Sequence, residues 1–209
     1  MIDSWISKLK FKKAYERIVE KLLSKRISAN KLTIIGLIIG LSSAFTIFLS
    51  GIFIEFNLFL LLTSISLMII SFLIDTLDGP VARLEGPTVF GGILDLFCDR
   101  TVEVSIIIAI VSTDTLNLIY PGLFSLGSII LCLSMFLIVG SLFENKSADE
   151  KSKVIRYRKG LIERSETFLF LLGITILIFW RFILLWTFAI LVFLTALLRL
   201  RDAYILFKK

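Results

Sequence analysis

The sequence contains no histidine, and it has only two cysteines and three prolines in 209 residues. Because histidine is the side chain that most often moves protons near neutral pH, any acid–base chemistry here is expected to fall to carboxylates. Cys98 and Cys132 both lie in apolar segments and provide no framework of disulfide bonds. We interpret both cysteines as packing residues.

Charged residues are scarce as well. They make up 19% of the chain, whereas 57% of the residues are hydrophobic and the mean hydropathy is +0.94. This composition excludes an ordinary soluble domain of this length and predicts an integral membrane protein. Membrane lipids are expected to surround it, and a nucleic-acid partner is not expected.

Uncharged or nearly uncharged runs recur along the chain at the length that a membrane requires. About 20 helical residues cross a hydrocarbon core of about 30 Å, so the sequence predicts an all-α protein with six transmembrane helices. Pro121 and Gly122 are expected to break the fourth helix near its start. The six expected spans are residues 32–54, 56–74, 91–111, 115–143, 168–180 and 182–198.

The first 31 residues have a different pattern. Apolar side chains recur at helical spacing with lysines and arginines between them, which is typical of a helix that lies in the membrane interface. A helix that binds a soluble partner is the alternative. We therefore divide the chain into an amphipathic juxtamembrane helix, residues 1–31, and one membrane domain, residues 32–209.

The distribution of basic residues predicts the orientation in the membrane. With six spans, 22 of the 23 Lys and Arg residues lie on one side and only Arg181 lies on the other. Cytoplasmic segments carry the excess of positive charge. Both chain termini are therefore expected to face the cytoplasm, and the protein is expected in the cytoplasmic membrane.

Four aspartates lie where two of these runs meet water. Asp75 and Asp78 follow the second run at a spacing of i, i+3, and Asp95 and Asp99 begin the third at i, i+4. Each pair therefore shares one face of its helix, and charged residues at membrane depth indicate a functional site. Carboxylates held close together repel unless protons or cations intervene, and their oxygens suit Mg²⁺, Mn²⁺ or Ca²⁺. The sequence predicts a divalent metal site facing the cytoplasm.

The aspartates belong to a longer pattern, D-x-x-D-G-x-x-A-R followed by G-x-x-x-D-x-x-x-D. This pattern resembles the signature of the CDP-alcohol phosphatidyltransferase family of integral membrane enzymes. Seven residues separate its two halves here, where the family more often has eight, and we interpret the difference as a shortened loop. The signature positions are Asp75, Asp78, Gly79, Ala82, Arg83, Gly91, Asp95 and Asp99.

The resemblance implies phospholipid biosynthesis by transfer of a phosphatidyl group from a CDP-lipid, ester- or ether-linked, to an alcohol, with release of CMP. It implies a pair of Mg²⁺ or Mn²⁺ ions and a homodimer in which each protomer has a complete site. Asp75, Asp78 and Asp95 would be metal ligands. Asp99 would complete the metal cluster and take the proton from the acceptor hydroxyl. The alternative for Asp99 is a buried ion pair with Arg100 or another cation.

The resemblance also implies contacts to the CDP-lipid donor. Asn30 and Thr33 fall at the entry to the first span, where the family faces the cytidine, although Asn30 could also cap that helix. Gly79 and Ala82 are small enough for close approach of the nucleotide, or for close helix packing. Arg83 would bind the pyrophosphate. The full set of donor contacts is Asn30, Thr33, Asp78, Gly79, Ala82, Arg83 and Gly91.

The acceptor is expected to be a phosphorylated alcohol, such as inositol phosphate or glycerol phosphate. The stretch from Gly160 to Thr167 resembles the G-x-x-E-R-x-E-R segment of the phosphatidylinositol-phosphate synthase branch, with threonine in place of the second arginine. The Ser-x-x-Lys pattern of that branch late in the fourth helix is absent. Candidate acceptor ligands are Arg156, Arg164 and Arg199, which could instead be ordinary positive-inside residues.

Two other functions fit parts of the sequence. A metal-dependent membrane prenyltransferase also uses aspartates on a pyrophosphate donor, but the complete signature and the six spans argue against it. A cation transporter would place carboxylates along the membrane depth, whereas these carboxylates gather at one side. Release of CMP from a CDP-lipid would separate the three functions.

Overall fold

The computed structural model describes the backbone of residues 28–149 and 164–207, and the side chains of residues 28–141 and 165–205. Most of the expected interfacial helix, residues 1–31, lies outside the described residues. Only its last residues are described, and they begin the first membrane helix.

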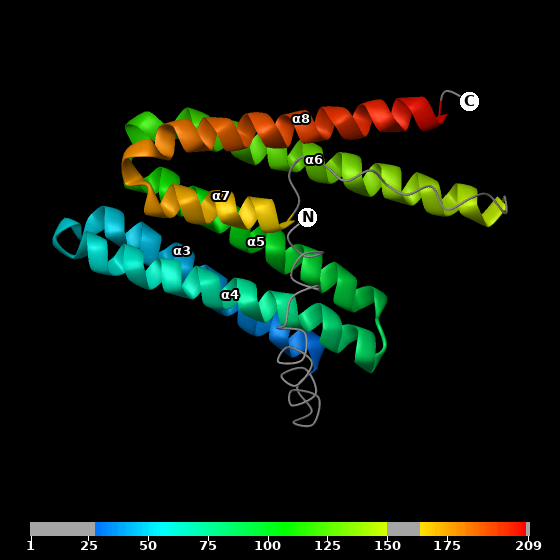
Figure 1. Ribbon diagram of the computed structural model, residues 1–209, viewed down its shortest axis with the longest axis horizontal. Coiled ribbons are helices and arrows are strands. Elements are labelled where there is room, and N and C mark those ends of the chain that lie inside the picture. Colours follow the sequence, from blue (N-terminus) through cyan, green and yellow to red (C-terminus); the bar gives the residue numbers. More distant parts are fainter. Residues whose placement is uncertain (1–27, 150–163, 208–209) are drawn as a thin grey trace, which may run out of the picture.

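Within the described ranges the fold is all-α, as the sequence predicts, and contains six α-helices (Figure 1). Two of the links between them are short 3₁₀ turns, η1 (Ile54–Phe56) and η2 (Ile178–Trp180). The helices are α3 (Ala29–Ile52), α4 (Asn57–Glu85), α5 (Val89–Thr113), α6 (Thr115–Asp149), α7 (Arg164–Ile176) and α8 (Arg181–Phe207).

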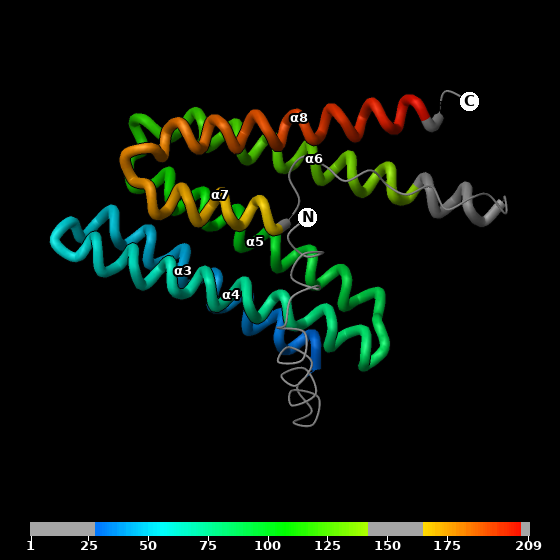
Figure 2. The backbone as a smooth tube through the Cα atoms, in the orientation of Figure 1, coloured from blue at the N-terminus to red at the C-terminus, as the bar shows by residue number. Residues whose placement is uncertain are grey.

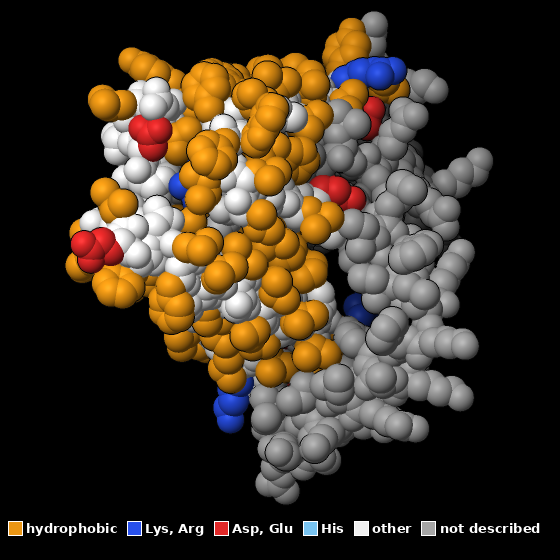
Figure 3. All heavy atoms as spheres, turned by 60° about the vertical axis from the view of Figure 1, so that its left-hand side comes forward, with side chains coloured by type: hydrophobic (Ala, Val, Ile, Leu, Met, Phe, Trp, Pro, Cys, Tyr) orange, Lys and Arg blue, Asp and Glu red, His pale blue; other side chains and the backbone are white. Residues whose placement is uncertain are grey.

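Four of these helices, α3, α4, α6 and α8, are long and apolar enough to cross a membrane. Helix α5 is long enough but carries the charged residues of the signature, and α7 is a shorter apolar helix. Hydrophobic side chains cover most of the described face shown in Figure 3, with charged groups at its margins. This surface is that of an integral membrane protein.

The helices are arranged as two packed groups. Helix α3 packs along α4 and α5, α6 packs along α8, and α7 contacts α4, α5 and α8 (Figure 2). The buried core between the groups includes Ile47 of α3, Met68 of α4, Ile107 of α5, Ile174 of α7 and Phe188 of α8. The ring of Phe72 in α4 stacks on that of Phe168 near the start of α7, so the start of α7 lies beside the part of α4 that carries Asp75.

Small residues bring α3 close to its neighbours. A Cβ at Gly40 would lie 2.6 Å from a methyl group of Val102, which leaves no room for a side chain. The Ser43 hydroxyl donates to the Ser64 carbonyl at 3.0 Å, and the Ser71 hydroxyl donates to the Gly36 carbonyl at 2.8 Å. Lipid tails are as apolar as leucine, so close backbone packing and interhelical hydrogen bonds hold such helices together.

Helix α4 extends well beyond its expected span. The sequence predicts that the membrane span ends at residue 74 and that Asp75 and Asp78 share one face of a helix, and the structure shows one continuous helix through the signature, and through Pro80, to Glu85. The shorter spacing within the signature is accommodated by a link of three residues, in which Gly86 has a φ of 101° that glycine adopts readily. The Glu85 carboxylate accepts a hydrogen bond of 3.0 Å from the Ala29 amide, and this bond ties the end of α4 to the start of α3.

The expected break in the fourth span is wrong, because α6 runs without interruption through Pro121. The proline is fully buried, and its carbonyl accepts the Ser125 hydroxyl at 2.7 Å. Gly122 allows close contact with Val111 of α5, since a Cβ there would lie 2.2 Å from a valine methyl. A proline costs a membrane helix one backbone hydrogen bond, and packing from neighbouring helices compensates for that loss.

Arg181 closes the opposite end of the bundle. Its side chain is only 7% exposed, and it donates to the carbonyls of Ile174 and Thr175, at 3.2 and 3.4 Å, and to the Thr113 hydroxyl at 2.9 Å. The last carbonyls of a helix have no partner within it. Arg181 therefore caps α7 and links it to α5.

We expect Arg181→Met to lower the free energy of unfolding by about 1–3 kcal/mol, because it leaves buried acceptors without donors. Thermal unfolding of the purified protein in detergent measures the change. Arg201→Met is the control, since Arg201 is an exposed cation on the same helix. Equal melting temperatures for the two variants would contradict a capping role for Arg181.

Candidate active site

The aspartates of α4 and α5 meet at one end of the bundle. Asp75 lies on α4, and Asp95 and Asp99 lie one turn apart on α5. One carboxylate oxygen of each of these three residues lies within 4.8 Å of the others. Two helices that both pack against α3 thus hold three acidic groups at a distance where their charges repel strongly unless a cation or proton is shared.

Asp78 lies one turn further along α4 and is not part of this group of three. It is 5% exposed, and its carboxylate accepts the Thr33 hydroxyl at 2.8 Å. It is still near enough to Asp95 for their charges to interact. Asp78 therefore connects the acidic group to the beginning of α3.

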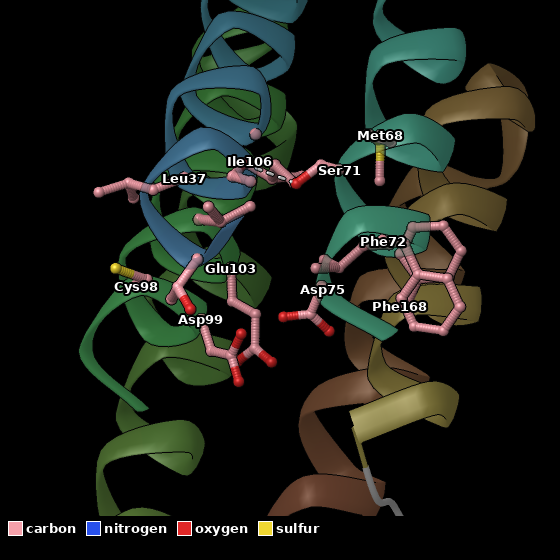
Figure 4. A pocket seen from close by; sticks show the side chains of 15 residues that line it. Leu37, Met68, Ser71, Phe72, Asp75, Cys98, Asp99, Glu103, Ile106 and Phe168 are labelled. Atoms are coloured by element: carbon pink, nitrogen blue, oxygen red, sulfur yellow. Dashed lines mark hydrogen bonds between the residues drawn. The ribbon is translucent and has the colours of Figure 1, made fainter. Parts of the chain in front are cut away.

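A cavity extends from the acidic group into the bundle between α3, α4, α5 and α7. Figure 4 shows the side chains of Asp75, Asp99 and Glu103 directed toward a common space at one end of it. The other end is mainly apolar and is lined by Leu37, Met68 and Ile106 (Figure 4). The rings of Phe72 and Phe168 stack beside Asp75 with centroids 4.0 Å apart (Figure 4). The cavity therefore combines an acidic mouth with an apolar interior.

A second pocket lies beside α5 and is lined by other residues of that helix. Arg100 of α5 and Arg199 of α8 both line it, together with Thr167 of α7 and Thr195 of α8. The Arg199 guanidinium donates to the Cys132 carbonyl at 2.9 Å and lies 5.2 Å from the centre of the Phe136 ring. These contacts hold the Arg199 side chain against α6.

Sequence reasoning missed an ion pair on α5. The alternative for Asp99 was a pair with Arg100, but Arg100 bonds Glu103 instead. Their i, i+3 spacing in an otherwise apolar helix was a readable signal. Glu103 is buried and lines the first cavity, so a further carboxylate lies beside Asp75 and Asp99.

The expected donor contacts gather where α3, α4 and α5 meet. A Cβ at Gly91 would lie 3.1 Å from the Asn30 side-chain oxygen, which places these two residues side by side. Asn30 lies inside the first turn of α3, so Ser28, and not Asn30, is at the N-cap position. Thr88 caps α5 by accepting the Gly91 amide at 3.0 Å.

The two small signature residues of α4 have different surroundings. Among the described residues, none lies within 4 Å of a Cβ built at Gly79, so packing in that part of the chain does not require glycine there. Ala82 packs against a small apolar cluster formed by Ala29, Leu32 and Val81, so its small size serves helix packing. Arg83 is exposed on the same stretch of helix.

The candidate acceptor residues are only partly described. Arg199 lies in the second pocket. Arg164 is the first residue of α7, but its side chain lies outside the described residues, and so does all of Arg156. Thr167, which stands where the resembling branch has a second arginine, lines the pocket with Arg199.

Comparison with known families agrees with this geometry. Residues 26–197 match the sequence model of the CDP-alcohol phosphatidyltransferase family. The match covers most of the chain, and the protein belongs to this family.

Individual relatives lie in the branch that makes inositol-phosphate lipids. The chain is 38% identical over 102 residues to archaetidylinositol phosphate synthase of Pyrococcus horikoshii, a match that spans 48% of this chain and about half (50%) of that relative.

Two crystal structures of phosphatidylinositol phosphate synthase from Mycobacterium tuberculosis share the fold. The one with CDP-DAG bound has a TM-score of 0.71 at 21% identity and covers 92% of this chain and 94% of that one. The one with manganese and citrate has a TM-score of 0.71 at 21% identity and covers 91% and 88%.

Proposed function

We propose that this protein transfers a lipid phosphate group from a CDP-linked lipid to the hydroxyl of a phosphorylated alcohol and releases CMP. The observation that carries this proposal is the group of three carboxylates at the mouth of an apolar cavity. An acidic, metal-binding mouth suits a pyrophosphate, and an apolar interior suits a lipid chain. The similarity to archaetidylinositol phosphate synthase supports the choice of inositol phosphate as a first acceptor to test.

The carboxylates of Asp75, Asp95 and Asp99 have the chemistry that a hard divalent cation requires. They supply oxygen donors close enough together for one ion to contact all three. The proposed metal is Mg²⁺ or Mn²⁺, bound as a pair of ions. Asp78 is the proposed fourth ligand. When bound, such ions neutralise charge on the phosphate oxygens and on the departing CMP.

The residues of the chain orient the reactants and move the proton. Asp99 takes the proton from the acceptor hydroxyl while the oxygen of that hydroxyl bonds to the lipid-side phosphorus. The bond from that phosphorus to the CMP oxygen breaks, and CMP leaves with the bonding electron pair. Thr33 holds Asp78 in place through their 2.8 Å hydrogen bond. Asn30, Thr33, Gly79, Ala82, Arg83 and Gly91 are the proposed donor contacts, and Arg156, Arg164 and Arg199 are the proposed acceptor contacts.

Orientation and assembly complete the proposal. The excess of basic residues on the side of the aspartates supports a site that faces the cytoplasm, where a water-soluble phosphorylated acceptor is available. The uncharged stretches of the helices offer surface for a second copy, and we propose a homodimer with one complete site in each protomer.

We expect CMP release from CDP-lipid to require Mg²⁺ or Mn²⁺ and to stop when EDTA removes the ion. Asp75→Asn and Asp95→Asn should each lower kcat/KM at least about 100-fold, since loss of a direct ligand exceeds the usual cost of disturbing a metal's outer shell. Chromatographic detection of CMP and of the new lipid measures this loss. Glu55→Gln, an exposed carboxylate at the other end of the bundle, is the control. Full turnover in EDTA would refute the metal site.

Gly79 and Gly40 give a contrasting pair of tests. Gly79→Ala should leave stability unchanged or raise it by up to about 1 kcal/mol, because alanine favours helix and the Cβ meets open space. Gly40→Ala should lower stability by about 1–3 kcal/mol, because the stiff Val102 side chain is in the way.

If the nucleotide approaches Gly79, only Gly79→Ala should combine normal thermal stability with a several-fold higher KM for CDP-lipid. Thermal unfolding and initial-rate kinetics separate the two effects. An unchanged donor KM in a fully folded Gly79→Ala enzyme would remove Gly79 from the donor site.

Arg199→Ala should raise the acceptor KM roughly 10- to 100-fold, because a charge-assisted contact to phosphate is lost. The KM for CDP-lipid should change little, since Arg199 lines the second pocket and not the cavity with the carboxylates. Arg201→Ala, two residues further along α8, is the matched control. If Arg199→Ala keeps the wild-type acceptor KM, Arg199 does not bind the acceptor and is an ordinary positive-inside residue.

A further inference from the structure

Arg100 and Glu103 connect the two pockets across α5. Arg100 lines the pocket that contains Arg199, whereas Glu103 lines the cavity that contains Asp75 and Asp99. An ion pair between the Arg100 guanidinium and the Glu103 carboxylate joins them. The signature of the family ends at Asp99, so neither residue belongs to it.

The Arg100 side chain keeps unused donors. A guanidinium has five N–H groups, and Arg100 makes one hydrogen bond within the described part of the chain, to Glu103. Its Nε atom is buried and has no partner among the described residues. Glu103 is more enclosed, with a side chain 10% exposed against 31% for Arg100. The carboxylate is therefore the fixed member of the pair, and the guanidinium reaches toward the pocket.

The second pocket has the composition of an anion site. The described residues that line it include two arginines and two threonines and no carboxylate, and the remaining lining side chains are apolar or a cysteine thiol. Both guanidinium groups are near enough to Cys132 to act on it electrostatically. Because Arg100 is paired with Glu103, one net positive charge remains in these apolar surroundings, and a bound anion neutralises it.

We propose that Arg100 is a second acceptor-binding residue, which contacts the acceptor's phosphate together with Arg199, and that Glu103 is the positioning residue that holds it. This inference rests on the proposed function. The resembling branch has a second arginine where this chain has Thr167, and Thr167 and Arg100 line the same pocket. Arg100 supplies from α5 the positive charge that α7 lacks at that position.

The placement on α5 also relates binding to chemistry. Asp99 and Arg100 are consecutive residues of one helix, so their side chains diverge by about 100°. Asp99 faces the cavity with the metal ligands and Arg100 faces the other pocket. The acceptor's hydroxyl and its phosphate are thus held from neighbouring residues of one rigid element. Phosphorylated acceptors are selected because an uncharged alcohol leaves the Arg199 charge and the spare donors of Arg100 without an anion.

The test compares Arg100→Gln, Glu103→Gln and the double variant with the wild type. The double variant matters because Arg100→Gln alone leaves a buried carboxylate unpaired, which destabilises a protein, whereas removal of both charges does not. We expect Arg100→Gln and the double variant to raise the KM for inositol phosphate roughly 10- to 100-fold and to leave the KM for CDP-lipid nearly unchanged. Arg100→Lys keeps the positive charge but not the planar guanidinium with its several N–H donors. Its acceptor KM should therefore lie between those of the wild type and Arg100→Gln.

A binding measurement without turnover accompanies the kinetics. Inorganic phosphate should raise the melting temperature of the wild type, and this shift should be lost in the double variant and kept in Arg201→Gln. Glu103→Gln should raise the acceptor KM less than Arg100→Gln does, since the cation remains but is no longer held.

The outcomes separate this inference from the function on which it rests. If the wild type releases no CMP with any phosphorylated acceptor, the proposed function fails. If the wild type is active and the folded double variant keeps both its acceptor KM and its stabilisation by phosphate, the role of Arg100 is overturned while the function stands. If the double variant has a lower melting temperature than the wild type but the same acceptor KM, the ion pair is purely structural.

Discussion

Repulsion among carboxylates is the constraint around which this fold is built. Asp75 from α4 and Asp95 and Asp99 from α5 are held within a few ångströms of one another, and such an arrangement needs rigid support. Helix α3 supplies that support through Gly40, which lets α5 approach. Contacts from Ala29 to Glu85 and from Thr33 to Asp78 tie the start of α3 to the end of α4. The acidic group cannot relax apart without breaking the packing of α3.

Helix α5 separates two chemical environments. Acidic groups and an apolar interior lie in one cavity, and arginines with hydroxyl groups lie in the other pocket. A helix turns about 100° per residue, so Asp99 and Arg100 line different pockets although they are neighbours in sequence. One helix in this way borders both the acidic group and the pocket with the two arginines.

The class of protein and the grouping of the aspartates could be predicted from the sequence, because both depend on local information. Hydrophobic runs predict membrane helices by length alone, and the spacing of four aspartates predicts which of them share a helix face. The sequence placed the end of the second membrane span at residue 74, since hydropathy falls at Asp75, and the helix continues from there to Glu85. It expected a break at Pro121, but Ser125 and the close contact of Gly122 with Val111 keep α6 continuous.

By itself the sequence determined that this chain crosses a membrane as helices and brings an acidic signature to one end of the bundle, because composition and helical periodicity are properties of consecutive residues. Only the tertiary structure decided which groups meet across helices. It put Asp78 against Thr33, paired Arg100 with Glu103 rather than Asp99, and set Arg199 against α6. These contacts depend on how deeply each helix packs and how it is rotated, and small residues such as Gly40 set that geometry through neighbours far away in the sequence.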